Sequence, residues 1–402
     1  MSALRALAYR GRFLGHRLRA AIRPPLPQTG NYFVAGISGL ELPRHPSIRR
    51  SRPRPLEHQD TDYARRFDDT SLFYDVFQLD GRVVAVGPPL RNLAELVDSV
   101  SASLDGQPVS RESDLLLNVE RSSFPGSGKV LSLEAGAGVG RLEAPVQPAQ
   151  LDVFDGRRVL LTISKDNRLD WIVDWLEFHT RVHGVDAALI YDNGSQSYSP
   201  ADLLERIRHV PGLAAAVVVP WPYKYGPDGL PDGRFWDSSF AQPVMWEHAR
   251  RRFLMRAAAM VNADIDELIV AASGGTLFDH LARSPSGALL YPGQWITPVR
   301  RGLHWSGRRH RDFRYRLDGE APYLNKWTCV PARVPDDVQL GIHRFIGAFE
   351  ATYVPEITFR HFRGITNNWK YDRIRGRRRY RPQRHIEDEV WVRQMRDIGW
   401  SD

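Results

Sequence analysis

The pattern of apolar and polar positions changes near residue 150 and divides the chain into two unlike parts. Between residues 71 and 147 the apolar positions form short runs separated by turn residues. Runs at 72–79 and 82–86 flank Asp80-Gly81, and Asp-Gly between two β-rich runs is typical of a hairpin. Similar short runs follow at 97–104, 115–119 and 130–133. This regular spacing predicts a small β-sandwich-like domain over residues 71–150.

Beyond residue 157, continuous apolar runs alternate with runs of helical spacing. The expected order is strand 158–163, helix 170–182, strand 187–191, helix 200–210, strand 214–219 and helix 242–260. Gly184 suits the end of the first helix, and Ser199 with Pro200 suits the start of the second. The alternation predicts an α/β domain with a largely parallel sheet over residues 151–385, followed by a C-terminal helix or tail over 386–402.

The N-terminal 70 residues divide into a basic helical pattern and a region without periodicity. In residues 1–25, leucines fall near one helical face and arginines cover much of the rest. Such a helix can lie on an anionic membrane surface, or it can be a solvated or partner-packed tail. Residues 26–70 are rich in Pro and Arg and are predicted to be a linker.

Three acids interrupt an apolar run that follows the third helix. On an extended backbone, Asp264 and Asp266 would project the same way, and Glu267 would point to the opposite face. Charges are costly to bury unless they are paired or bound to metal. A divalent cation with oxygen ligands would resolve this cost and hold a diphosphate, whereas a solvated acidic turn is the plainer alternative.

Polar clusters also follow the first two strands of the α/β part. Ser164-Lys165-Asp166-Asn167 follows the first strand, and Asp192-Asn193-Gly194-Ser195 follows the second. The carboxyl ends of parallel strands meet at one edge of a sheet, where ligands bind. Lys165 could meet a phosphate there, and Asp192 and Asn193 could accept hydrogen bonds from a base or ribose. Ordinary turn chemistry explains each cluster equally well by itself.

Composition limits the compartment and the partners without choosing a function. The net charge of +8 favours anionic partners such as nucleotides, acidic lipids or anionic glycans. With Cys329 as the single cysteine, no internal disulfide can form, and no apolar run reaches the ~18–20 residues of a membrane-spanning helix. We therefore expect a cytoplasmic protein with peripheral contact at the inner membrane face.

An ordered set of motifs over residues 157–372 resembles family-92-type glycosyltransferases and their bacterial family-2-like relatives. The set comprises a charged loop, a W-x-x-x-H helix, a G-V-D turn, a Y-D-N-x-S strand end, a helix opened by Gln, a D-x-D-E strand, a lysine strand, an I-H pair and a later H-F. In this sequence these are Lys165-Asp166-Asn167, Trp175 to His179, Gly184-Val185-Asp186, Tyr191 to Ser195, Gln242, Asp264 to Glu267, Lys326, Ile342-His343 and His361-Phe362.

The resemblance implies a GT-A-like, Rossmann-like mixed sheet and transfer of a sugar from a nucleotide sugar to a glycan or lipid-linked acceptor. It implies Mn²⁺ or Mg²⁺ bound by Asp264 and Asp266, with His361 or His343 as a third ligand, and a UDP- or GDP-sugar as donor. The residues it implies for the nucleotide sugar are Ser164, Lys165, Asp166, Asp192, Asn193, Gln242, Asp264 and Lys326.

The acceptor side is less sharply predicted. A catalytic base would come from Glu267, Asp279 or Asp312. Aromatic and basic side chains after the acidic strand are expected near the acceptor; these are Trp295, Trp305, His343 and Arg363. For the aromatic members, simple packing in the core is the alternative.

Three other functions stay open. The charged loop lacks the family's glutamate, which suits a non-catalytic GT-A-like protein that binds anionic glycan or a membrane. A nucleotidyltransferase also pairs acids around a metal. The basic run at residues 373–381 would suit nucleic acid, but no recognised nucleic-acid module accompanies it, and we expect no nucleic-acid partner.

Overall fold

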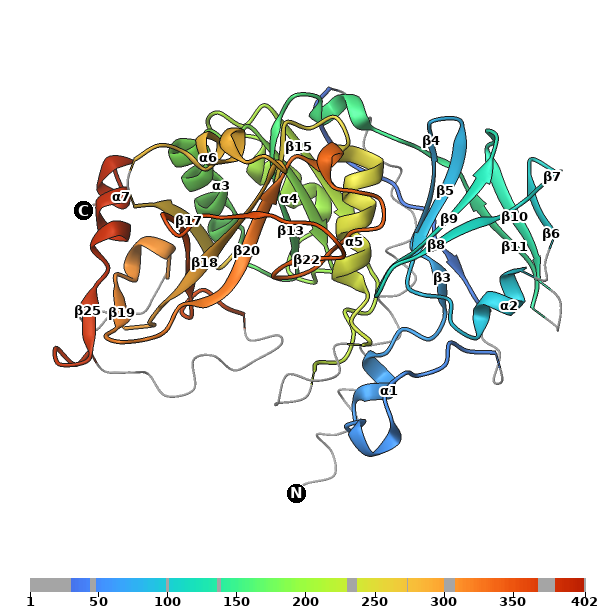
Figure 1. Ribbon diagram of the computed structural model, residues 1–402, viewed down its shortest axis with the longest axis horizontal. Helices are drawn as coiled ribbons and strands as arrows, with labels where there is room; N and C mark the ends of the chain where they lie inside the picture. Colours follow the sequence, from blue (N-terminus) through green and yellow to red (C-terminus); the bar gives the residue numbers. More distant parts are fainter. Residues whose placement is uncertain are drawn as a thin grey trace, which may run out of the picture.

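A computed structural model describes residues 30–43, 48–98, 101–135, 139–229, 237–272, 274–299, 308–367 and 380–400. The fold is mixed α/β with one large mixed sheet and two smaller β-sheets (Figure 1). The expected basic helix at residues 1–25 and most of the basic run at 373–381 lie outside the described residues. Within the described ranges, no helix has the length and apolar character needed to cross a membrane.

The large sheet contains the parallel core that the sequence predicts. Its strands run in the order β1, β15, β14, β13, β16, β20, β18, β24 and β17. The parallel members are β1 (Tyr32–Val34), β15 (Ala215–Pro220), β14 (Ala187–Asp192), β13 (Arg158–Ser164) and β16 (Ala259–Asn262). The rest of the sheet is mixed. The strands β20 (Tyr323–Cys329) with β16, β18 (Ala288–Ile296) with β20, and β17 (Glu267–Ala271) with β24 (Ile357–Phe362) pair antiparallel, whereas β18 pairs parallel with β24 and with β23 (Thr352–Tyr353).

Helices cover both faces of the parallel strands because strand residues alternate between the two faces. On one face, Leu160 and Ile190 lie in a core cluster with α3 (Leu169–His183) and α4 (Pro200–Ile207). On the other face, Leu161 and Leu189 lie in a cluster with α5 (Ala241–Ala249) and the π-helical turn at Arg250–Leu254. Both hydrophobic faces of this sheet are therefore buried.

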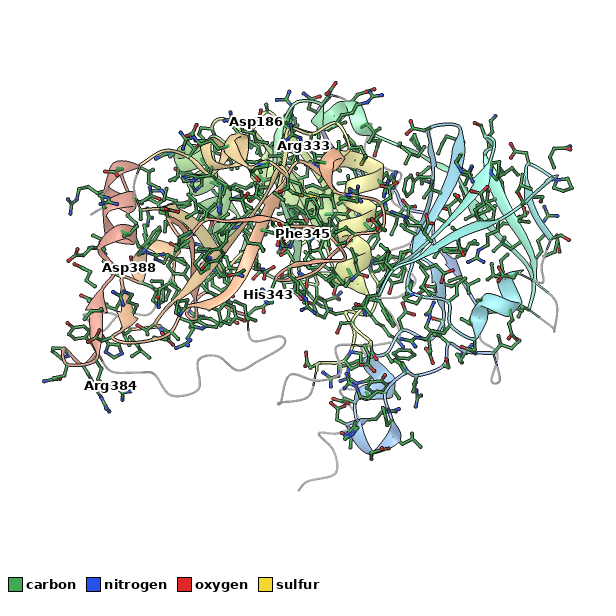
Figure 2. All side chains as sticks on the ribbon, viewed as in Figure 1. Asp186, Arg333, His343, Phe345, Arg384 and Asp388 are labelled. Atoms are coloured by element: carbon green, nitrogen blue, oxygen red, sulfur yellow. The ribbon has the colours of Figure 1, made fainter. Side chains whose placement is uncertain are left out.

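The β-rich part packs against the α5 side of this sheet (Figure 1). One sheet has the order β12, β4, β5, β9 and β8, and the other has the order β11, β10, β6 and β7. Alternate residues of β4 face two ways: Val76 shares a cluster with Leu131 of the second sheet, and Phe77 shares one with Leu161. Side chains fill the space between the two parts of the chain (Figure 2).

The strands of the β-rich part are short, and Asp80-Gly81 and Asp105-Gly106 form its hairpin turns with positive φ angles, as the Asp-Gly pairs predict. The bounds are β3 (Ser71–Phe73), β4 (Asp75–Leu79), β5 (Arg82–Gly87), β6 (Ser101–Leu104), β7 (Gln107–Val109), β8 (Glu112–Leu115), β9 (Glu120–Pro125), β10 (Val130–Ala135), β11 (Gly140–Pro145) and β12 (Gln147–Pro148).

The described residues of the segment predicted as a linker, 30–43 and 48–70, pack onto the rest of the protein. β1 pairs with β15 and extends the large sheet, and β2 (Leu40–Glu41) pairs with β3. The buried guanidinium of Arg50 donates to the backbone oxygens of Pro89 and Asp68. Pro and Arg content alone suggested a linker. In the structure, pairing with β15 and β3 provides hydrogen bonds for the backbone of β1 and β2.

Two predicted elements have different bounds. Residues 97–104 were expected to be a strand, but α2 (Leu93–Asp98) ends there before β6 begins. The helix expected at 242–260 ends at Leu254, and β16 begins at Ala259.

The remaining elements surround the mixed half of the sheet and the junction with the β-rich part. The helices are α1 (Tyr63–Arg66), α6 (Leu277–Arg283) and α7 (Glu389–Asp397), with short helical turns at Leu56–His58, Leu151–Phe154, His310–Asp312 and Pro331–Arg333. The short paired strands are β19 (Tyr315–Leu317) with β25 (His385–Glu387), and β21 (Gln339–Leu340) with β22 (Phe345–Ile346).

Candidate functional site

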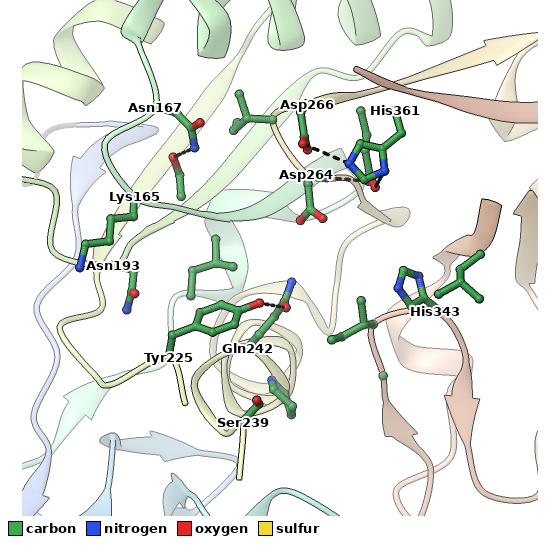
Figure 3. Close-up of a pocket in the computed structure, with 18 of the residues that line it drawn as sticks. Lys165, Asn167, Asn193, Tyr225, Ser239, Gln242, Asp264, Asp266, His343 and His361 are labelled. Carbon is green, nitrogen blue, oxygen red and sulfur yellow. Dashed lines mark hydrogen bonds and ion pairs between the residues drawn. The ribbon is translucent and has the colours of Figure 1, made fainter. Parts of the chain in front are cut away.

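A cavity of about 660 Å³ lies beyond the carboxyl ends of β13 and β16 (Figure 3). The strand order places β14 on one side of β13 and β16 on the other, so the chain crosses over in opposite directions from β13. A crevice opens at such a switch point because the two loops leave toward opposite faces. Ser164 ends β13 and Lys165 follows it, Asp264 follows β16, and all three line the cavity.

The acidic segment is a turn between two strands of the sheet that do not pair with each other. β16 ends at Asn262 and β17 begins at Glu267, so Asp264 and Asp266 do not extend from one continuous strand as predicted. Both nevertheless line the cavity. The buried ring of His310 is 2.9 Å from the backbone oxygen of Ile265 and supports the turn from behind.

Glu267 and Lys326 form a buried ion pair under this turn. The Lys326 ammonium lies 2.8 Å from Asp264 Oδ2 and 3.1 Å from Glu267 Oε2, and both Lys326 and Glu267 are 1% exposed. Asp264 N donates to Glu267 Oε2 at 2.9 Å. Glu267 therefore borders the cavity beside Asp264, whereas the sequence predicted that it would point to the opposite face.

Opposing effects set the charge of this pair. Burial alone would lower the pKa of Lys326, but the carboxylates of Asp264 and Glu267 outweigh burial and raise that pKa above its usual value. Burial raises the pKa of Glu267 to about 7, although the Lys326 ammonium opposes the shift. Lys326 does not line the cavity, so its predicted contact with a nucleotide is replaced by contact with the acids.

His361 holds the second acid of the turn. Its Nε2 lies 3.1 Å from Asp266 Oδ2, and its Nδ1 lies 3.7 Å from Glu267 Oε1. The His361 ring stacks on Trp295 at 4.0 Å between centroids, and the Arg363 guanidinium lies 4.4 Å from the Trp295 centroid. Trp295 and Arg363 do not line the cavity, so neither fits its predicted place on the acceptor side.

The donor types at the turn fit a divalent cation bound mainly through a substrate. Asp264 and Asp266 present carboxylates to the cavity, with side chains 35% and 16% exposed. Among the described residues, no three His, Cys, Asp or Glu side chains are grouped to hold a metal ion by themselves. Mg²⁺ commonly takes one or two carboxylates and completes its shell with water and phosphate oxygens. The pair suits that mode and not a cation enclosed by protein ligands.

The two polar clusters after β13 and β14 mainly stabilise loops. Asp166 has a positive φ of 50°, and its Oδ1 accepts hydrogen bonds from the backbone of Gln196 and Ser197. The buried carboxylate of Asp192 accepts from Ser195. Neither acid lines the cavity, so the predicted contacts of Asp166 and Asp192 with a nucleotide sugar are wrong.

Other members of the clusters do reach the cavity, on its side opposite His343 in Figure 3. Lys165 and Asn167 line it, and so does Asn193, whose amide donates to the backbone oxygens of Trp221 and Tyr223. That bonding leaves the Asn193 amide oxygen as the acceptor that can face a ligand.

The first turn of α5 forms the floor of the cavity as Figure 3 is drawn. Gln242 lines the cavity as predicted, and its Oε1 accepts a 2.7 Å hydrogen bond from the Tyr225 hydroxyl. Tyr225 and Ser239 also line the cavity, and the sequence analysis did not select either. Both precede α5 in a segment without periodicity, which gave no signal.

His343 reaches the cavity from the turn between β21 and β22. Its Nδ1 donates to Asn325 O at 2.8 Å, which leaves Nε2 as an acceptor. Burial, with the nearby Lys326 ammonium, lowers the pKa of His343 to about 4, so the ring is neutral near pH 7. His343 lines the cavity, and its predicted role on the acceptor side stays a prediction.

The remaining predicted site residues lie elsewhere. Asp279 caps α6 by accepting from Thr276, and Asp312 accepts from Arg309 N in a short turn. Neither lines the cavity, so the structure contradicts both as catalytic bases. Local helix capping accounts for these acids. Trp305 lies outside the described residues.

The β-rich part also contributes to the cavity wall, which the sequence analysis missed. Leu117 and Asn118 line the cavity from the connection between β8 and β9. Asn118 N donates to Gln339 Oε1 at 2.7 Å, across 221 positions of sequence. No local pattern carries a contact of that range.

Neither a scan against models of protein families nor a search of curated proteins gave a match to this chain.

Proposed function

We propose that this protein is a metal-dependent glycosyltransferase of the GT-A type, with the β-rich part as a small β-sandwich-like domain in front of it. The observation that carries the proposal is the acid pair Asp264 and Asp266, presented to a cavity at the switch point of the parallel strands. The motif resemblance over residues 157–372 supports the same class.

In this proposal the residues divide into three roles. Asp264 and Asp266 hold Mn²⁺ or Mg²⁺, which when bound supplies positive charge for the leaving nucleoside diphosphate. Lys165 offers a second positive charge to the diphosphate, and Gln242 and the Asn193 amide oxygen offer hydrogen bonds to the nucleotide sugar. His361 positions Asp266, and the buried pair of Lys326 with Glu267 positions Asp264.

The first test measures binding of nucleotides and nucleotide sugars through the thermal unfolding temperature, with Mn²⁺ present or with EDTA. We expect one nucleoside diphosphate and its sugars to raise the unfolding temperature with Mn²⁺ and not with EDTA, because binding to the native state stabilises it. Asp264→Asn and Asp266→Asn should lose this metal-dependent shift while they remain folded. A metal-dependent shift retained in both variants would contradict the assigned metal site.

A second function is favoured by the ion pair between Lys326 and Asp264. An ammonium already beside Asp264 can replace a metal cation, which suits a GT-A-like protein that binds anionic glycan or a membrane surface without turnover. Nucleotide binding that is equal with Mn²⁺ and EDTA, with no release of nucleoside diphosphate, would support this reading. Release of pyrophosphate would instead indicate a nucleotidyltransferase.

The site of action that best suits the basic charge is the cytoplasmic face of a membrane. Net charge of +8 favours contact with anionic lipids. Sedimentation with vesicles that contain anionic lipid, compared with neutral vesicles, tests this directly.

A further inference from the structure

Exposed leucines collect at one side of the cavity. The large apolar side chains with the highest exposure among the described residues are Leu56, Leu115, Leu117, Leu324 and Tyr353. Leu117 and Leu324, 64% and 56% exposed, both line the cavity, and Leu115 lies two positions before Leu117. Single exposed leucines are ordinary, but two at the wall of one cavity need a reason.

A hairpin ties the two leucines to one wall although they lie 207 positions apart in the sequence. At one end, Gln339 of β21 accepts from Asn118 N, next to Leu117. At the other end, His343 donates to Asn325 O, next to Leu324. Trp327 Nε1 also donates to Gly341 O at 2.7 Å and fixes the hairpin on β20. The two leucines are therefore held on either side of one rigid turn.

Two apolar side chains of the hairpin lie on the same wall, next to the polar His343 and Arg344. Ile342 and Ile346 from the hairpin line the cavity and are half-buried. The opposite side, at the ends of β13 and β14, carries Lys165, Asn167 and Asn193. In Figure 3, His343 marks the hairpin side and Lys165 with Asn193 marks the far side, with the acid turn above them. The cavity thus has its leucines and two isoleucines on the hairpin side, among polar residues, across from Lys165, Asn167 and Asn193.

We propose that this wall, formed by Leu117, Leu324, Ile342 and Ile346, binds the hydrocarbon part of an amphiphilic acceptor, a sugar joined to a lipid chain. The inference rests on the proposed transferase function and specifies its acceptor class. A nucleotide sugar is polar throughout and suits the side that carries Lys165 and Asn193. The apolar side chains on the hairpin side are therefore left to contact the acceptor. The β-rich part then takes part in acceptor recognition through Leu117, which lines the cavity from the connection between β8 and β9.

The test uses methyl, butyl and hexyl β-D-glucosides, each kept monomeric, titrated into the full-length protein by calorimetry. The head group is constant, so affinity differences report the chain alone. Full burial strengthens binding by about fourfold per methylene, so we expect at least a tenfold gain from methyl to hexyl. Leu117→Ser with Leu324→Ser should abolish that gain. Leu56→Ser, at a more exposed leucine outside the cavity, should keep it.

Three results would overturn the proposal: equal affinity for all chain lengths, a retained gain in the double variant, or an equal loss in Leu56→Ser. The substituted leucines are exposed, so all variants should unfold at the wild-type temperature, which checks folding. The metal-dependent nucleotide shift is measured on the same samples. Absence of that shift in the wild-type protein would refute the transferase function. The chain-length results alone decide the acceptor class.

Discussion

At the scale of single residues, Lys326 is the internal cation of the acid turn. It is 1% exposed and contacts Asp264 and Glu267, and its ammonium lies closer to Glu267 than the His361 ring does. The sequence marked Lys326 only through a motif resemblance and suggested a substrate contact. Because Lys326 is buried and contacts Asp264 and Glu267, it instead helps to position Asp264.

Lys326→Met should cost about 3 kcal/mol of unfolding free energy, because removing one partner leaves buried carboxylate charge without compensation. Urea unfolding measures the loss. Lys326→Met with Glu267→Gln should recover part of it, because the second change removes the unpaired charge. Equal stability of Lys326→Met and wild type would show that Glu267 is not charged in this pair.

At the scale of elements, two histidines of α3 take the place of a neighbouring strand. β17 pairs with β24 on one side only. On its other side, Ile269 N donates to His179 Nε2 at 3.2 Å, and His183 Nε2 donates to Ile269 O at 2.8 Å. These contacts satisfy backbone groups that would otherwise be buried without partners, so the W-x-x-x-H helix anchors the strand that follows the acid turn.

Both rings must be neutral for these contacts. His179 Nδ1 lies 2.7 Å from Trp175 O, so Nε2 is its acceptor, and a proton there would face the Ile269 N–H. Burial lowers the pKa of His179 to about 3 and of His183 to about 4. Near pH 7 both rings are uncharged in the folded protein.

These pKa values predict the direction of a pH effect. Unfolded histidine titrates near pH 6.5, so between about pH 4 and 6.5 the unfolded chain binds more protons than the folded chain. Stability should therefore fall as pH falls through that window. His183→Gln should reduce proton uptake on unfolding at pH 5 by about one proton, measured by urea unfolding from pH 5 to 7. His209→Gln, on the surface, should keep the wild-type slope.

At the scale of the whole molecule, a buried ion network joins the β-rich part to the α/β part. Asp75 of β4 is fully buried and accepts from Arg252 at 2.6 Å and from Ser38 N at 2.7 Å. Its Oδ2 also lies 2.8 Å from His248 of α5, whose Nδ1 lies 2.7 Å from the Tyr191 hydroxyl. A second pair joins Arg121 of β9 to the buried Glu247 at 2.7 Å.

Asp75→Ala should therefore cost about 3–5 kcal/mol, because it leaves the Arg252 guanidinium buried without its carboxylate. In the wild-type protein the two parts should unfold in one transition. Urea unfolding monitored by fluorescence and by circular dichroism measures this. Arg65→Ala, which removes an exposed pair with Asp62, should leave the midpoint unchanged. Separate transitions in wild type would contradict a shared, buried interface.

The local sequence determined the elements that depend on local physics. The Asp-Gly hairpins, the Ser199-Pro200 start of α4, the Gly184 end of α3 and the alternating α/β order follow from short-range patterns and agree with the structure. The acids and Lys165 were also found, because adjacent charges after apolar runs are visible in the sequence itself.

Only the tertiary structure decided which residues share the site. Asp166, Asp192, Asp279 and Asp312 looked as suitable as Asp264, yet local turns and caps use their oxygens. Leu117 lies at the cavity next to Asn118, which bonds to Gln339, 221 positions away in the sequence. β1 joined the large sheet from a segment that lacked any periodic pattern. Spacing along the chain reports local hydrogen bonds such as caps and turns. A cavity forms between segments that are distant in the sequence, and no local pattern in one segment indicates which other segment it will contact.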